Sequence, residues 1–196
     1  EIKRSYDCGG QITEKAAKET GLRRGTPVAI GSHDIDACAC GVGAIKGAAC
    51  MIAGTWSVNL LVTSEPHINE KWMCRNFIEK GKWLQQASSP ASATNLEWFA
   101  EHFCGKKGKS VYELCDKEVD NIETQIVYHP FLFGSPLQNA SASFIGIRGN
   151  DTKKEMLRAL YEGVAFNHRM HIEDLNREIG VNIDKIRFTG GASKRA

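Results

Sequence analysis

The chain has 196 residues, of which 42% are hydrophobic, and a formal net charge of +2. This length and composition can bury the core of one globular domain or somewhat more, while the near-neutral charge favours neither nucleic acid nor a membrane surface as a partner. No apolar run approaches the ~18 residues of a membrane helix, no signal peptide opens the chain, and seven singly scattered cysteines fit a reducing cytoplasm.

The first third of the chain predicts a mixed α/β arrangement. Residues 12–22 form a short predicted helix that Gly21 closes, and residues 26–31 form a predicted buried strand. Residues 34–47 follow as a helix of small residues that can pack closely on a sheet. Residues 48–64 contain two apolar runs around a Gly-Thr turn, which is the pattern of a β-hairpin.

The middle of the chain predicts further helices and one apolar stretch. Residues 95–103 have helical periodicity, residues 110–122 continue at helical spacing, and residues 126–136 are largely apolar. The first of these helices has an apolar face made of Leu96, Phe99 and Phe103.

The longest predicted element is a helix from about Thr152 to Gly180. Thr152 and Glu155 have the spacing of a capping box, and Gly180 is suited to end the helix. Its apolar stripe consists of Met156, Leu160, Val164, Ile172, Leu175 and Ile179.

The ends of the sequence predict a piece of a longer protein. The chain starts at Glu1 without an initiator methionine. It stops soon after a strand-like run, residues 185–189, reaches a Gly-Gly turn, as a strand-turn-helix unit cut before its helix does. We therefore expect missing material at the C-terminus and at the N-terminus.

Three segments resemble known binding motifs but lack a residue or a geometry that each motif requires. Residues 105–110 end like a phosphate-binding loop, but its first glycine falls on Phe103, so a solvated loop is expected. Residues 41–47 have Lys46 where a dinucleotide fingerprint needs its third glycine, and helix packing explains them better. His33, Asp34 and Asp36 diverge in direction at a strand-helix junction, which argues against a closed structural metal site.

Two local features have both a functional and a structural interpretation. Asp34 stands where open α/β sheets present ligand-binding groups, although on position alone the N-cap of the helix that follows is the favoured interpretation. Gly54 and Thr55 form a tight turn in a region, residues 47–70, without lysine or arginine. A phosphate held there would meet backbone N–H groups, a hydroxyl and a metal ion, although an ordinary hairpin turn explains the same residues. Gly190-Gly191 is open to the same two interpretations.

Taken together and in order, these segments resemble the FGGY carbohydrate kinases of the actin-like, ribonuclease-H-like ATPase superfamily. The resemblance rests on residues 21–44, 53–56, 142–163 and 188–193, with Leu160 a departure from the family signature. It implies an α/β fold with a mixed sheet and flanking helices, here incomplete. It also implies a division into residues 1–46, the end of the N-terminal kinase domain, and residues 47–196, a C-terminal domain truncated after its adenosine loop.

The same resemblance implies an ATP- and Mg²⁺-dependent sugar kinase. Asp34 corresponds to the catalytic base that orients a hydroxyl for phosphoryl transfer, while His33 either touches the sugar or packs. Thr94 and Glu97 correspond to nucleotide contacts, with a surface helix cap as the alternative. The remaining implied ATP contacts are the phosphate residues Gly54 and Thr55 and the adenosine residues Gly190, Gly191, Ala192 and Ser193.

Within the family, residues 54–56, 87–99, 129–135 and 159–172 favour the branch that phosphorylates L-xylulose. Another ketose or polyol stays open as the substrate, and so does a homodimer. Since most of the N-terminal lobe is expected to be missing, the chain alone is expected to be inactive. The rival classes are a non-catalytic nucleotide-binding module and a Rossmann-type oxidoreductase, against which the broken glycine fingerprint argues.

Overall fold

A mixed five-stranded sheet is the centre of the structure, a computed structural model that describes residues 3–44, 47–105, 117, 119–136 and 139–195. The strand order is β5-β6-β4-β3-β9, and only the β3–β9 pair is parallel. The strands are β3 (Ala48–Ala53), β4 (Ser57–Thr63), β5 (Met73–Asn76), β6 (Trp83–Ser89) and β9 (Lys185–Thr189).

The predicted hairpin is confirmed as β3 and β4. Their antiparallel register ends with Ala53 opposite Ser57, so residues 54–56 form the turn. β4 is buried along its whole length, because both of its neighbours are strands and both of its faces carry helices.

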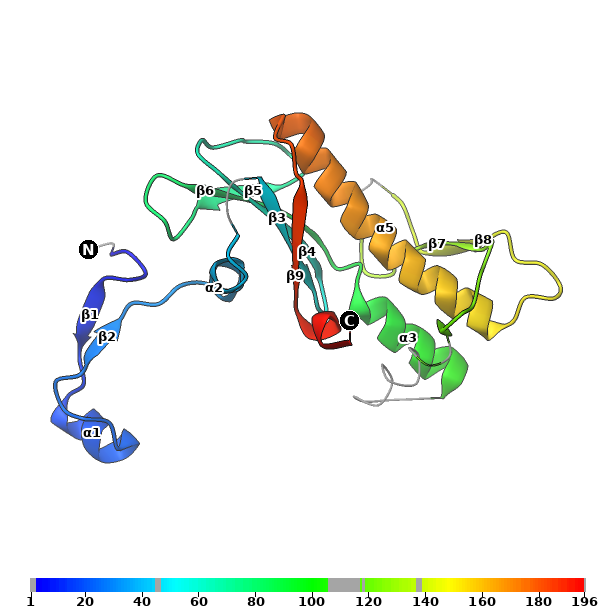
Figure 1. Ribbon diagram of the computed structural model, residues 1–196. Coiled ribbons are helices and arrows are strands. Elements are labelled where there is room, and N and C mark those ends of the chain that lie inside the picture. The colour runs from blue at the N-terminus through cyan, green and yellow to red at the C-terminus, as the bar shows by residue number, and fades with distance from the viewer. Residues whose placement is uncertain (1–2, 45–46, 106–116, 118, 137–138, 196) are drawn as a thin grey trace.

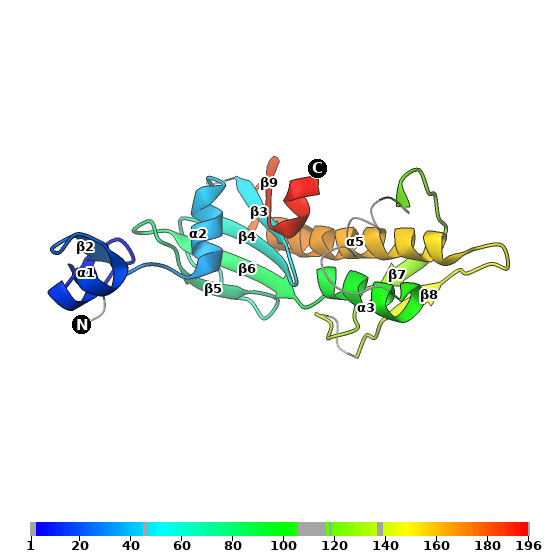
Figure 2. The same cartoon turned by 90° about the horizontal axis from the view of Figure 1, so that it is seen from below.

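A helix covers each face of the sheet (Figure 2). Successive residues of a strand point to opposite faces, so Leu60 packs in a cluster with the helix α2 (Asp34–Gly41) and Leu61 packs with Leu175 of the helix α5 (Lys153–Ile179). The small residues of α2, such as Ala39, allow this helix to lie close to the sheet. The sheet is therefore enclosed as in other layered α/β folds.

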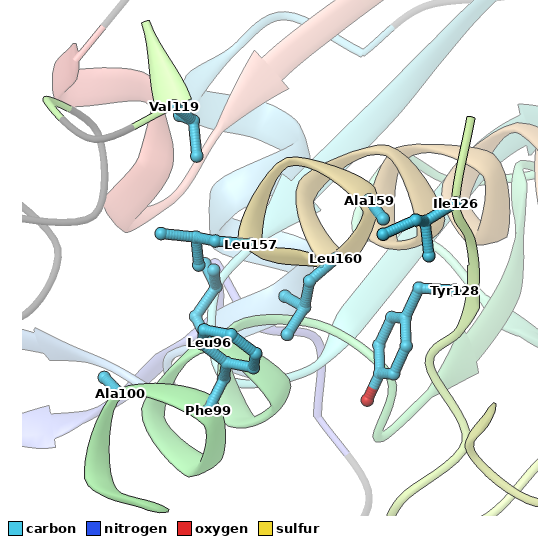
Figure 3. Packing of buried hydrophobic residues seen from close by; sticks show 9 residues of the cluster. All are labelled: Leu96, Phe99, Ala100, Val119, Ile126, Tyr128, Leu157, Ala159 and Leu160. Carbon is cyan, nitrogen blue, oxygen red and sulfur yellow. The ribbon is translucent and has the colours of Figure 1, made fainter. Parts of the chain in front are cut away.

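A second apolar core lies beyond the sheet, where α5 meets the helix α3 (Ala93–Cys104) and the strand β7 (Val127–His129) (Figure 3). β7 pairs with β8 (Ser143–Ile145). The core is formed by Leu96, Phe99, Ala100, Val119, Ile126, Tyr128, Leu157, Ala159 and Leu160. Since α5 contributes to this core and also covers the sheet, it joins the two halves of the C-terminal part of the chain.

The predictions for α5 are confirmed in detail. Thr152 is the N-cap and forms a capping box with Glu155, and Gly180 ends the helix in the left-handed conformation with φ 70°. Within its predicted stripe Leu160, Ile172 and Leu175 are buried, and Met156, Val164 and Ile179 are half-buried.

The N-terminal unit lies apart from the sheet in both views (Figures 1 and 2). It consists of β1 (Cys8–Gln11), α1 (Glu14–Thr20) and β2 (Pro27–Ala29), with β1 and β2 antiparallel. Gly21 ends α1, as predicted, and the strand predicted at residues 26–31 is present as β2, but its expected burial is wrong because every residue of β2 is exposed. A unit this small has no core of its own in which a strand could be buried.

Other differences are local. α2 ends at Gly41, earlier than predicted, and Phe103 of α3 is 50% exposed although it stacks on Phe99. A 3₁₀ helix, η1 (Gly191–Arg195), follows β9. The predicted helix at residues 110–122 and the loop at 105–110 lie largely outside the described residues. None of the helices within the described ranges is long and apolar enough to cross a membrane.

Candidate functional site

Three segments that are distant in the sequence meet at one edge of the sheet. β3 and β9 run parallel with Ile52 opposite Thr189, so the turn at residues 54–56 and the Gly190-Gly191 turn leave the sheet at the same end. β6 is antiparallel to β4 with Ser89 opposite Ser57, so the chain that leads from β6 into α3 starts there as well. Figure 1 shows η1 and the start of α3 at this end of β3, β4 and β9.

Gly190 makes the closest of these approaches. Its φ is 103°, a conformation that side chains disfavour, and a Cβ atom there would lie 2.5 Å from the carbonyl oxygen of Ala53. The Gly190 carbonyl accepts hydrogen bonds from the backbone amide of Ser193, at 3.2 Å, and from its hydroxyl, at 2.8 Å. These bonds fold residues 191–193 back over the end of β3, which η1 contacts.

The start of α3 is fixed to the hairpin turn by a backbone bond. The amide of Ala93 donates to the carbonyl of Gly54 at 3.1 Å. Thr94 uses its hydroxyl locally and donates to the Pro90 carbonyl at 2.9 Å. Glu97 lies one turn further along α3 and is exposed.

This junction is chemically suited to an anion. Residues 54–56 and 90–93 carry no charged side chain, and residues 190–192 are Gly-Gly-Ala. They offer backbone groups at close approach together with the hydroxyls of Thr55 and Ser193, which is the type of site that receives phosphate through amide donors.

A buried polar layer lies directly behind the junction, between α5 and the sheet. Asn167, His168 and His171 of α5 are each 3% exposed. Their partners are the sheet residues that border the junction, Ser57 and Ser89 among them. Burial, with a smaller contribution from His171, lowers the pKa of His168 to about 4, and burial also lowers the pKa of His171, so both imidazoles are neutral at pH 7.

Asp34 is not part of this junction. It is the first residue of α2, its side chain is 88% exposed, and its Oδ1 accepts a hydrogen bond from the amide of Ile35 at 2.8 Å. His33, not Asp34, is the N-cap, and its Nδ1 also accepts from Ile35. Asp34 was expected at the end of a buried strand, and this is wrong because β2 is exposed. The hydrogen bond that Asp34 accepts from Ile35 is instead typical of a residue that stabilises the start of its own helix.

α2 itself is fixed at both ends by arginines, one from each edge strand of the sheet. Arg75 of β5 forms an ion pair with the buried Asp36 at 3.4 Å. Burial raises the pKa of Asp36 more than Arg75 lowers it. At the other end, Arg187 of β9 donates to the carbonyl of Val42, the C-cap residue, at 3.0 Å. α2 thus spans the sheet from the strand at one edge to the strand at the other.

The structure brings together some of the predicted site residues and leaves others separate. Gly54, Thr55 and Gly190–Ser193 leave the same end of the sheet, and Thr94 lies in the α3 start that bonds to Gly54, whereas Asp34 begins α2 on one face of the sheet and His33 is the N-cap of that helix. Within the described ranges, no group of three or more His, Cys, Asp or Glu side chains is gathered to hold a metal ion. Sequence reasoning missed the polar layer of α5, although its members follow the spacing of the helix stripe.

Comparison with known proteins identifies what the chain is similar to. Residues 49–196 match the model of the C-terminal domain of the FGGY family of carbohydrate kinases. Identity is 32% to a probable L-xylulose kinase of Haemophilus influenzae, 30% to an L-xylulose/3-keto-L-gulonate kinase of Escherichia coli and 26% to an autoinducer-2 kinase of Klebsiella pneumoniae. These alignments include 98%, 95% and 100% of this chain and 40%, 38% and 40% of the relatives. The chain thus spans about 40% of the length of the relatives that it matches.

Solved structures give the same result for the fold. The crystal structure of a xylulose kinase from Rhodospirillum rubrum superposes with a TM-score of 0.81 at 22% identity. The superposition covers 98% of this chain and 40% of the other. The expected actin-like ATPase fold, with a mixed sheet and flanking helices, is confirmed.

The close approach at Gly190 leads to a stability prediction. Gly190→Ala places a methyl group against the Ala53 carbonyl in a disfavoured backbone conformation, so we expect the free energy of unfolding to fall by about 3 kcal/mol. Gly191→Ala is the control, because a Cβ atom there meets nothing within 4 Å. Urea denaturation of the two variants measures the difference, and equal stability would contradict the packing described here.

Neutral His168 leads to a pH dependence. The pKa of His168 is about 6.5 in the unfolded chain and about 4 in the folded one. The contribution of neutral His168 to the free energy of unfolding is therefore fully present above about pH 6.5 and falls as the pH decreases towards 4. We expect the stability advantage of the wild type over His168→Asn to shrink by up to about 3 kcal/mol between pH 7 and pH 4. Urea denaturation across this range measures it, with exposed His129→Asn as the control; an advantage that stays constant contradicts the assignment.

Proposed function

We propose a catalytic assignment for this chain from one premise, that it belongs to the FGGY family of carbohydrate kinases. In the full-length protein it serves the transfer of the γ-phosphoryl group of ATP to a hydroxyl of a ketopentose, with L-xylulose as the preferred substrate. We divide the chain into two parts: residues 1–46 are the end of the N-terminal kinase domain, and residues 47–196 are the C-terminal domain. The reaction takes place in the cytoplasm.

The observation that carries the proposal is the junction at the sheet edge. The turn at residues 54–56, the start of α3 and the Gly190 turn meet there through the Ala93–Gly54 bond and the approach of Gly190 to Ala53. Phosphoryl transfer depends mainly on positioning and on stabilisation of charge, and we assign both to the backbone groups and hydroxyls that these three segments bring to one end of the sheet. A hairpin turn without ligand-binding function does not need two further glycine-rich or helix-start segments against it.

In this assignment the nucleotide lies across the junction. Gly54 and Thr55 hold the phosphates, Gly190, Gly191, Ala192 and Ser193 hold the adenosine, and Thr94 and Glu97 contact the nucleotide from α3. Mg²⁺ bound to the phosphates supplies charge neutralisation. Residues 54–56, 90–93 and 190–193 contain no carboxylate, so at this junction the hydroxyls of Thr55 and Ser193 and the backbone carbonyls are the oxygen ligands that would be available to the ion.

Asp34 is assigned as the base, on the strength of the Gly-x-x-Asp motif of the family in residues 31–34. Its 88% exposed carboxylate is accessible to a sugar hydroxyl, and one oxygen is held by the Ile35 amide. Asp34 orients the hydroxyl and accepts its proton as the phosphoryl group is transferred. His33, 54% exposed beside it, contacts the sugar.

The base assignment predicts a separation of binding from turnover. Asp34→Asn keeps the size of the side chain but cannot accept the proton, so we expect kcat of the full-length protein to fall by at least about 100-fold with ADP affinity within twofold of the wild type. Glu173→Gln, in an exposed ion pair with Arg169 on α5, is the matched control and should keep full activity. Coupled ADP release and calorimetric titration measure the two quantities. Unchanged turnover in Asp34→Asn would indicate a nucleotide-binding module that does not use this carboxylate.

Substrate choice is tested on the full-length protein with a panel of sugars. L-xylulose, D-xylulose, 3-keto-L-gulonate and autoinducer-2 are compared by kcat/KM from ADP release, and L-xylulose is expected to be highest. A higher kcat/KM for another sugar of the panel would contradict L-xylulose as the preferred substrate and identify that sugar instead. The 196-residue chain assayed alone is expected to show no ATP-dependent phosphorylation of L-xylulose, because it spans about 40% of its relatives.

A further inference from the structure

Three polar side chains interrupt the apolar stripe of α5 where the helix crosses the sheet. Asn167, His168 and His171 occupy positions at which an amphipathic helix ordinarily presents apolar residues to its core. Burying such groups costs free energy unless each finds a partner. Their partners therefore indicate what this part of the helix holds in place.

Asn167 holds the segment that leads into α3. Its Nδ2 donates to the hydroxyl oxygen of Ser89 at 3.0 Å and to the carbonyl of Ala91 at 3.4 Å. Nε2 of His171 lies 3.2 Å from the same Ser89 oxygen. Two residues after Ala91, the amide of Ala93 bonds to the carbonyl of Gly54. Asn167 is thus linked through a short piece of backbone to the hairpin turn.

His168 holds the other side of the same turn. Its Nδ1 lies 2.9 Å from Oδ1 of Asn59 and 3.1 Å from Oγ of Ser57. An amide oxygen only accepts, so Nδ1 carries the proton and donates, which fixes the tautomer of the neutral ring. Ser57 is the first residue after the turn and pairs with Ala53 across the hairpin.

We propose that Asn167 and His168 are positioning residues for the nucleotide site. They fix the turn at residues 54–56 and the segment at residues 90–93 from behind, so that the backbone groups facing the phosphates are preformed before the nucleotide binds. These bonds fix the segments more specifically than apolar packing does, because hydrogen bonds are directional. The inference rests on the proposed function, since it assigns a ligand to that junction.

The test uses the full-length protein and matched variants of each residue. Asn167→Leu and His168→Leu keep most of the volume and remove the donors. His168→Asn places a side-chain N–H where Nδ1 was and leaves a small cavity. Arg169→Gln, on the exposed side of the same helix turn, is the control. The dissociation constant of Mg²⁺–ADP is measured by calorimetry, and KM for ATP and for the sugar by ADP release.

A positioning role predicts a specific pattern. Both leucine variants should bind Mg²⁺–ADP at least about tenfold more weakly and show a raised KM for ATP, with KM for the sugar within twofold of the wild type. His168→Asn should bind within about twofold of the wild type although its thermal stability is lower. A purely structural role instead predicts that affinity follows thermal stability across all variants, and that result, or unchanged affinity in the leucine variants, overturns the proposal.

Ser89→Ala keeps the proposal testable if the leucine variants do not fold. It removes only the oxygen that Asn167 and His171 share, and affinity for Mg²⁺–ADP should fall about fivefold; unchanged affinity overturns the proposal. Failure of the proposed function is distinguishable, because then the wild-type protein itself neither binds Mg²⁺–ADP nor phosphorylates any sugar.

Discussion

The arrangement of the candidate site depends on how closely two strands can approach where they leave the sheet. β3 and β9 are parallel, and the residue that follows β9 lies almost against the carbonyl of Ala53. Only glycine at position 190 permits this contact with its positive φ. Because of it, the chain after β9 folds back over the end of β3, beside the hairpin turn, and residues separated by more than a hundred positions form one surface.

Much of the fold follows from local patterns. Thr152, Glu155 and Gly180 mark the ends of α5 because caps satisfy backbone groups within a few residues of each other. The strands β5 and β6 could not be predicted in this way. β6 contains Gln85 and Gln86, both buried, and Gln85 finds its partner in Thr63 of the neighbouring strand, so a polar sequence becomes a central strand only through tertiary contacts.

The site shows the same division. The glycines at 54 and 190 are visible in the sequence, but their position at the same end of the sheet depends on the parallel pairing of β3 and β9, which no local pattern encodes. Asp34 was expected at a buried strand end, yet β2 is exposed because the small N-terminal unit encloses no core. Asn167 and His168 were overlooked because polar residues interrupt the apolar pattern by which a buried helix face is recognised. In the structure both side chains are buried on that face.

The side-chain contacts of α2 make this helix and the sheet one packed unit. Its inner face packs on β3, β4 and β6, and Arg75 and Arg187 tie its two ends to the outermost strands. Within the described residues, the short stretch 30–33 joins the N-terminal unit to α2 (Figure 1). Because α2 is held to the sheet in this way, Asp34 at its first position is attached to the same packed group of elements as the glycine turns.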